Sequence, residues 1–209
     1  MIDFAEIYER IGYVFKDSSL LEKALTHSSF DRENNYERLE FLGDSIVGYA
    51  VSDLLYHQEM KTEGEMTDLR KRRVCEEPLS QLADDLGFSK NCQRRNCSLS
   101  EKMRSDLYEA VTAAIYLDSG IEDAIAFVKR TILLVPPAAP DYKTQLQQYC
   151  DKKKIDFKIV HTEEGKDNKK RFTAEVYIDG NSKGTGKGKK KKAAENEACR
   201  LALKALHLI

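Results

Sequence analysis

The sequence predicts an all-α domain followed by a small α+β domain with the element order α-β-β-β-α. Apolar residues recur at helical spacing through residues 1–134. Three of the four prolines fall in residues 135–141, and beyond them apolar and polar residues alternate as in strands. We therefore expect one domain over residues 1–134, a linker over 135–141 and a second domain over 142–209.

The charge is divided at the same place. Residues 1–140 hold 17 Lys and Arg against 25 Asp and Glu, a balance of −8, whereas residues 141–209 hold 17 against 10, a balance of +7. The near-neutral net charge of −1 hides this division. A basic domain favours a polyanionic partner, so the two domains are expected to do different work.

Composition argues against several classes of protein. No apolar run approaches the roughly 18 residues that span a membrane, and the N-terminus, MIDFAEIYER, lacks the basic and apolar regions of a secretory signal. The five cysteines are odd in number and form no CxxC pair, which disfavours a disulfide framework or a zinc site. These features predict a protein of a reducing compartment, the cytoplasm.

Two short helices open the first domain. Residues 3–12 form an amphipathic helix that ends at Gly12. Asp17 or Ser18 is suited to cap the second helix. A polar loop over residues 30–36 then leads into the longest helix of the chain.

That helix is predicted over residues 37–56, ERLEFLGDSIVGYAVSDLLY, where no proline interrupts the apolar period. Glu37, Glu40 and Asp44 stand at i, i+3 and i+7, on one stripe about one turn apart. Because like charges at this spacing repel, the stripe costs stability unless it is compensated, and a divalent cation would turn that cost into binding. The alternative is a solvated acidic face.

The next stretch predicts two helices separated by loops. Gly64 is expected to mark a turn and Thr67 to cap a basic helix, so that Glu63 lies on the preceding loop. A second helix is predicted over residues 78–87. Residues 88–102 show no period and are expected to form a loop.

Residues 104–118 predict a mostly apolar helix with a buried middle, and residues 121–134 the last helix of the domain. Asp106 and Glu109 stand at i and i+3, on one face near the start of the first of these helices. Buried charges need partners, and the simplest partner for two facing carboxylate pairs is a shared metal ion. The alternative is that the helix dipole favours acidic residues at this end.

The second domain is predicted from short alternating runs and one turn signal, Asp179-Gly180. Its expected elements are a helix over residues 142–150, strands over 157–160, 172–178 and 182–188, and a helix over 193–206.

A run of lysines and glycines, residues 184–192, precedes the last helix. Glycines let backbone amides approach a phosphate, and a lysine-led helix N-terminus is an anion site. The alternative is a solvated charge run. Its place at a helix start inside an α/β pattern favours phosphate contact.

Three blocks resemble the bacterial ribonuclease III family. ERLEFLGDS at residues 37–45 matches the family signature, and DLYEAVTAAIYLD at residues 106–118 matches a second block. The α-β-β-β-α unit resembles the double-stranded-RNA-binding domain, with KTQLQQY at residues 143–149 and KKAAENEA at residues 191–198 as its RNA-contacting helices. The resemblance implies an all-α endonuclease domain followed by this RNA-binding domain.

The resemblance also implies a reaction and the residues that carry it. The reaction is Mg²⁺-dependent hydrolysis of double-stranded RNA, leaving 5′-phosphate and 3′-hydroxyl ends with short 3′ overhangs. Oxygen ligands suit Mg²⁺, with Mn²⁺ as a substitute. The metal ligands carry over as Glu40, Asp44, Asp106 and Glu109. The catalytic residues are expected to be Asp44 and Glu109, together with Glu37 and Glu63, which match further acidic positions of the family's substrate valley.

RNA contacts are implied for the second domain at Gln147, Lys189, Lys190, Lys191 and Lys192. Recognition by A-form shape predicts weak sequence preference. Gln148, Asp151 and Lys190 depart from residues common in the family.

Phe41 matches the position that the family inserts into a partner subunit, which implies a homodimer. Phe41 also breaks the apolar stripe of its helix, and an exposed aromatic residue there is consistent with an interface. The alternative is ordinary core packing on a wide stripe.

Three functions are compatible with a chain of this kind: an active endonuclease, a non-cleaving RNA-binding protein on the same fold, and an acidic helical interaction protein with a basic tail. The presence of all four ligand carboxylates favours the first. The family's usual substrates imply a role in processing ribosomal, messenger and transfer RNA precursors.

Overall fold

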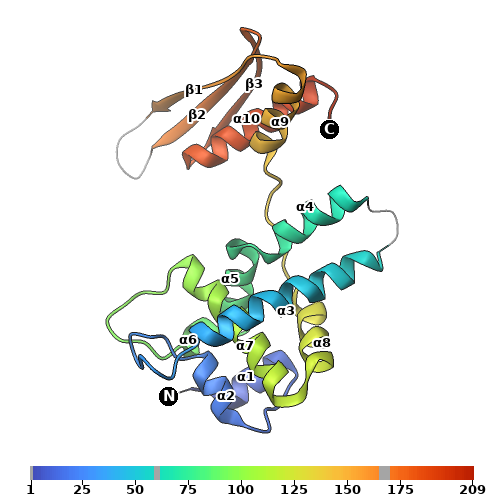
Figure 1. Ribbon diagram of the computed structural model, residues 1–209. Coiled ribbons are helices and arrows are strands. Elements are labelled where there is room, and N and C mark those ends of the chain that lie inside the picture. Colours follow the sequence, from blue (N-terminus) through green and yellow to red (C-terminus); the bar gives the residue numbers. More distant parts are fainter. Residues whose placement is uncertain (1, 59–61, 165–169) are drawn as a thin grey trace. The chain divides into compact units, whose positions relative to one another are not determined.

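The computed structural model describes residues 2–58, 62–164 and 170–209 and divides into two compact units, Met1–Ala139 and Pro140–Ile209 (Figure 1). Each unit has its own hydrophobic core. Val135 is buried in the first core, and the Ala138 N–H donates to the Arg72 carbonyl at 2.8 Å, so this stretch packs on the first unit. The predicted fold class is confirmed.

Within the described residues, the regular secondary structure of the first unit consists of helices, apart from one isolated β-bridge between Thr26 and Gln93. Its helices are α1 Phe4–Ile11, α2 Ser18–Ala24, α3 Glu37–Tyr56, α4 Glu63–Val74, α5 Glu76–Asp85, α6 Phe88–Asn91, α7 Glu101–Ser119 and α8 Ile121–Thr131.

Helix α7 forms the centre of the first core and packs against α3, α5 and α8. Its middle is buried on every side, as the predominance of small and apolar residues there predicts. The buried hydroxyls of Tyr108 and Thr131 lie 2.6 Å apart and share a hydrogen bond between α7 and α8. A polar pair buried this way fixes the register of the two helices because either hydroxyl alone would be left unsatisfied.

Helix α4 begins one turn earlier than predicted. The Thr62 hydroxyl accepts from the Glu65 N–H at 3.3 Å, and the Glu65 carboxylate accepts from the Thr62 N–H at 2.9 Å, a reciprocal capping box. The expectations that Gly64 marks a turn and that Thr67 caps the helix are wrong. Glu63 lies in the first helical turn, not on a loop.

Helix α7 also begins earlier, because the Ser100 hydroxyl caps it and Glu101 is its first residue. The loop expected over residues 88–102 is therefore wrong at both ends, where α6 and the start of α7 lie. Asp106 and Glu109 fall in the second and third turns of α7. The helix dipole acts mainly within the first turn, so it does not account for these two carboxylates.

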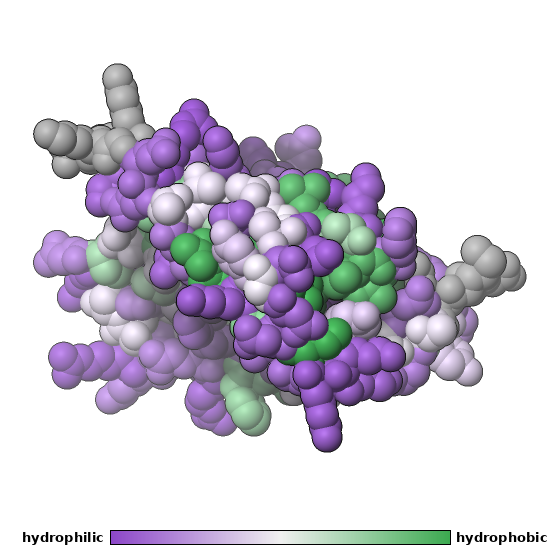
Figure 2. All heavy atoms as spheres, turned by 90° about the horizontal axis from the view of Figure 1, so that it is seen from above, coloured by the Kyte–Doolittle hydropathy of each residue, from purple (hydrophilic) through white to green (hydrophobic). Residues whose placement is uncertain are grey.

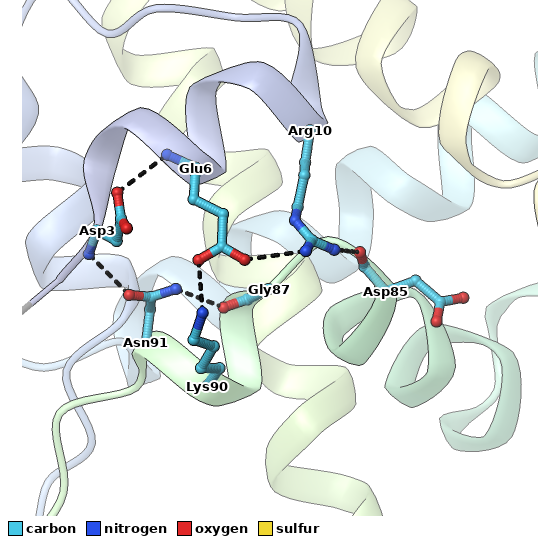
Figure 3. A network of polar contacts seen from close by, with 7 residues as sticks. All are labelled: Asp3, Glu6, Arg10, Asp85, Gly87, Lys90 and Asn91. Atoms are coloured by element: carbon cyan, nitrogen blue, oxygen red, sulfur yellow. Dashed lines mark hydrogen bonds and ion pairs between the residues drawn. The ribbon is translucent and has the colours of Figure 1, made fainter.

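A network of hydrogen bonds and ion pairs links α1 to α6 (Figure 3). The Asp3 N–H donates to the Asn91 side chain at 2.7 Å, and the Asn91 amide donates to the Gly87 carbonyl at 2.9 Å. Glu6 on α1 pairs with Lys90 on α6 at 2.8 Å. Arg10 on α1 extends the network by donating to the Asp85 carbonyl at the end of α5.

The second unit contains α9 Tyr142–Lys153, β1 Phe157–Glu164, β2 Arg171–Ile178, β3 Asn181–Gly188 and α10 Lys191–Ala205. The strands form an antiparallel sheet in the order β1-β2-β3. Asp179 and Gly180 both have positive φ, 47° and 75°, as a tight hairpin between β2 and β3 requires.

Helix α10 packs on β2 and β3, and α9 packs against α10. A Cβ on Gly184 or on Gly186 of β3 would overlap the backbone of α10. These glycines therefore set how closely the helix lies on the sheet, and with it the position of the lysines at the start of α10.

Candidate functional site

The site lies where α3 crosses α7, and Gly43 allows the crossing. A Cβ built on Gly43 would overlap the backbone carbonyl of Glu109, so only glycine permits this approach of the two helices. Glu40 stands one turn before Gly43, and Asp106 one turn before Glu109. Close backbone contact thus brings the acidic stripe of α3 against the acidic pair of α7.

Three carboxylates form a tight group, which we call the acidic cluster: Glu40, Asp106 and Glu109. Each offers an oxygen within 4.8 Å of the oxygens of the other two. Asp106 is buried, and the other two residues are partly buried. The predicted convergence of carboxylates from two separate helices is present.

Asp44 lies beside the acidic cluster but outside the tight group of three. Asp44 and all three cluster residues line one cavity of about 550 Å³, which we call the site cavity. Asp44 is exposed, whereas the cluster is recessed. The structure therefore brings the four predicted ligands to one cavity, with three of them in mutual reach.

The electrostatics of the site favour a bound cation. Burial, together with the neighbouring carboxylates of Asp44, Asp106 and Glu40, raises the pKa of Glu109 to about 8, and Lys102 opposes this rise. Burial also raises the pKa of Asp106. A carboxyl that is buried among like charges is a group whose ionised form a bound cation would stabilise.

Lys102 also contacts the acidic cluster, a position that the sequence analysis does not predict. Its ammonium donates to both Asp106 carboxylate oxygens, at 2.8 and 2.9 Å, and to Glu40 at 3.1 Å. Its i−4 spacing from Asp106 on one helix was the signal that would have found it. The expectation of a loop over residues 88–102 conceals this spacing.

The structure separates the two further acidic residues. Glu37 lines the site cavity, and so does Glu76 at the start of α5, which sequence reasoning missed. Glu63 lies elsewhere in the unit, in a cavity of about 200 Å³ between α3 and α4, where it accepts from the Thr67 hydroxyl at 3.0 Å. This chain by itself does not bring Glu63 to the acidic cluster.

One face of α3 carries exposed aromatic residues. Phe41 is 81% exposed at the edge of the site cavity, and Tyr49 and Tyr56 follow it along the same face at 56% and 76%. The alternative of core packing for Phe41 is excluded by this exposure. A row of exposed rings on one helix is the kind of surface that a partner covers.

The predicted RNA contacts lie on the surface of the second unit. Gln147 is exposed on α9, and residues 189–192 are exposed at the start of α10. Lys190 is the N-cap of α10, and its ammonium cannot accept a hydrogen bond, so its side chain does not compete with an anion for the first N–H groups of the helix. Figure 2 shows a face on which hydrophilic residues predominate and hydrophobic residues form small areas between them.

Comparison with protein families matches both units. The family model described as Ribonuclease-III-like matches residues 17–135, more than half of the chain. The chain belongs to the ribonuclease III family. The double-stranded RNA binding motif matches residues 142–206.

Curated relatives agree over nearly the full length. Ribonuclease 3 of Symbiobacterium thermophilum is 39% identical, over 95% of this chain and 92% of the relative. Ribonuclease 3 of Listeria monocytogenes (serotype 4a) is 35% identical, over 99% of each chain. Among solved structures, the nuclease domain of ribonuclease III from Campylobacter jejuni has a TM-score of 0.60 at 32% identity, covering 62% of this chain and 96% of that one.

As a member of this family, the chain is a hydrolase. The expectation of an endonuclease specific for double-stranded RNA is confirmed at the level of the family, and the RNA-binding unit is the family's second domain. No helix in the described part of the chain is both long and apolar enough to cross a bilayer. The five cysteines, all of them described, are free thiols.

Proposed function

We propose that the chain hydrolyses phosphodiester bonds in double-stranded RNA with Mg²⁺ held by the acidic cluster and Asp44, leaving 5′-phosphate and 3′-hydroxyl ends with short 3′ overhangs. The observation that supports this most strongly is the cluster itself, three carboxylates from two helices within 4.8 Å of one another. A non-cleaving RNA-binding protein has no use for such a group, which costs stability without a cation.

The acidic cluster suits a hard divalent cation. Mg²⁺ takes oxygen ligands at about 2.1 Å, so two ligands of one ion lie about 3 to 4 Å apart. The cluster oxygens lie within 4.8 Å of one another, and a small inward movement of partly buried side chains would close the remainder. An all-carboxylate donor set favours Mg²⁺ or Mn²⁺ over zinc.

The protein's part in the reaction follows from where its groups lie. Glu40, Asp106 and Glu109 would hold the ion, and Asp44, which lines the same cavity and is exposed, would complete the ligand set on its solvent side. When bound, the ion supplies an activated water and neutralises charge that develops on the phosphate and the leaving 3′ oxygen. Glu37, on the wall of the same cavity, is placed to orient water or substrate.

The second unit is proposed to hold the duplex. Gln147 on α9 would meet a minor groove with its 2′-hydroxyls, and Lys191 and Lys192 would meet phosphates, with Lys189 and Lys190 as helpers. The exposure of these residues and the absence of a side-chain cap from Lys190 at the start of α10 support the assignment. Contacts of this kind read A-form shape, so we expect little dependence on base sequence.

The active form is proposed to be a homodimer joined through α3. The 81% exposure of Phe41 and the row of rings that follows it support this interface. The similar Campylobacter jejuni nuclease domain has a region involved in dimer formation. In a dimer, Glu63, which lies outside this chain's acidic cluster, would serve the shared substrate valley.

The biological role is proposed to be the processing of ribosomal and other RNA precursors in the cytoplasm. Relatives named ribonuclease 3 over nearly the whole chain support the role, and five free thiols fit a reducing compartment.

Incubation with a long RNA duplex, with and without Mg²⁺, followed by analysis of the ends, tests the proposal. We expect short duplex products with 5′-phosphates and 3′ overhangs only when Mg²⁺ is present. Binding of the duplex without cleavage in either Mg²⁺ or Mn²⁺ would leave the non-cleaving alternative. A DNA duplex of the same sequence serves as the control and should stay intact.

A further inference from the structure

Lys102 occupies the oxygens that a metal ion needs. Its ammonium lies within 3.1 Å of three carboxylate oxygens, two on Asp106 and one on Glu40. These two residues supply two of the three members of the acidic cluster. An ammonium and a divalent cation cannot share these oxygens, because the two like charges would lie in contact.

Lys102 also supplies the positively charged side chain in the lining of the site cavity. Among the described residues that line this cavity, six are acidic and Lys102 is the basic one. Its partner Asp106 is buried, with 8% of its side chain exposed, so an unpaired charge there would be costly. Without a metal ion, Lys102 is the group that compensates the cluster.

The rest of the Lys102 side chain lies in the open. The side chain as a whole is 59% exposed, although its ammonium reaches inward to Asp106. A lysine stem has four rotatable carbons, and its strongly hydrated ammonium is stable in water. Lys102 can therefore withdraw from the cluster by turning about its side-chain bonds, without any change in the backbone of α7.

We propose that Lys102 is a displaceable internal cation. It holds Glu40 and Asp106 in place in the metal-free enzyme and yields their oxygens to the divalent ion when that ion binds. Lys102 is thus a positioning residue that keeps the site formed and sets the metal concentration at which the site fills. The inference rests on the proposed function, because it requires the acidic cluster to bind a cation.

Direct titration of the metal-free full-length protein with Mn²⁺, followed by calorimetry and by the paramagnetic resonance of free Mn²⁺, tests this without RNA or activity. Lys102→Gln removes the competing charge, and we expect it to bind Mn²⁺ about tenfold more tightly. Lys102→Arg keeps a cation and should stay near wild type. Lys16→Gln, which removes an exposed lysine between α1 and α2, controls for the change in net charge.

Thermal melting in a chelator gives a second readout. Lys102→Gln should melt at a lower temperature than wild type without metal and should gain more from Mn²⁺, whereas a lysine with a merely structural role would lower both melting temperatures equally. Equal Mn²⁺ affinity of wild type and Lys102→Gln would overturn this inference alone. Absence of Mn²⁺ binding by both proteins would overturn the proposed function as well.

Discussion

The Glu109 carboxyl lies where burial and three neighbouring carboxylates all act in the same direction, and its pKa rises to about 8 from an ordinary value of 4.5. In the metal-free protein it therefore keeps its proton at neutral pH. Binding of a cation must expel that proton, so metal affinity and acidity are coupled at this one residue.

This coupling predicts a pH dependence of stability in a chelator. Between pH about 4.5 and about 8 the folded protein binds the Glu109 proton and the unfolded chain does not, so the free energy of unfolding falls as pH rises through this window. Glu109→Gln cannot titrate, and we expect its urea-unfolding free energy to fall less steeply. Equal slopes for the two proteins would mean that Glu109 is not perturbed.

At the residue scale, sequence reasoning found the carboxylates but not their partner. Glu40, Asp106 and Glu109 stand at helical spacings that any correct helix assignment reveals. Lys102 contacts two of them, but its contact with Glu40 joins α7 to α3, and no spacing within one segment encodes a contact between two helices. Its contact with Asp106 was hidden by a misplaced helix start.

At the element scale, the structure depends on the crossing of α3 and α7. Gly43 of α3 lies against Glu109 of α7 at this contact, Glu40 stands one turn before Gly43, and Asp106 stands one turn before Glu109. The sequence predicts both helices, because their apolar periods are long and free of proline. It does not predict that Gly43 is their point of contact, since a glycine inside a helix reads only as a local weakness.

Gly43→Ala tests the crossing. The added Cβ would overlap the Glu109 carbonyl, so the helices must separate, and we expect a loss of about 1–3 kcal/mol in unfolding free energy together with much weaker Mn²⁺ binding. Gly64→Ala on α4 is the matched control: its Cβ meets nothing within 4 Å, and the change should stabilise the unit by about 0.5–1 kcal/mol. A Gly43→Ala protein with wild-type stability and metal affinity would show that the crossing tolerates a side chain.

Helix starts were the least predictable part of the elements. Thr62 with Glu65 and Ser100 begin α4 and α7 earlier than their apolar periods suggest. Caps are polar residues outside the periodic pattern, so a reading that follows apolar residues places the start too late. The shift matters for function, because it moves Glu63 onto a helix and Asp106 away from a helix end.

At the scale of the whole molecule, the two units differ in net charge in the same way as they differ in expected function. The first 140 residues carry a balance of −8 and the remainder +7. The acidic unit supplies ligands for a cation, and the basic unit supplies charge for a polyanion. The order of the blocks in the chain predicted both units, because each block carries its own pattern of periodicity and charge.

The basic unit gives a prediction about salt. Changing both Lys191 and Lys192 to Ala should weaken duplex RNA binding and reduce the slope of log affinity against log salt by up to about two, because each lysine that meets a phosphate releases a counterion. The control changes Lys158 and Lys204, two exposed lysines of the same unit, to Ala and should leave the slope near wild type. An unchanged slope in the first variant would exclude phosphate contact at the start of α10.

The most direct test of the central claim measures cleavage and binding of one RNA duplex by Glu109→Gln in Mg²⁺. We predict that cleavage falls by at least about a hundredfold, while the dissociation constant for the duplex stays within about threefold, because binding depends on the lysines of the other unit. Glu122→Gln, on α8 and outside the site cavity, should cleave as wild type does. Normal turnover by Glu109→Gln would contradict the assignment of the acidic cluster as the site of hydrolysis.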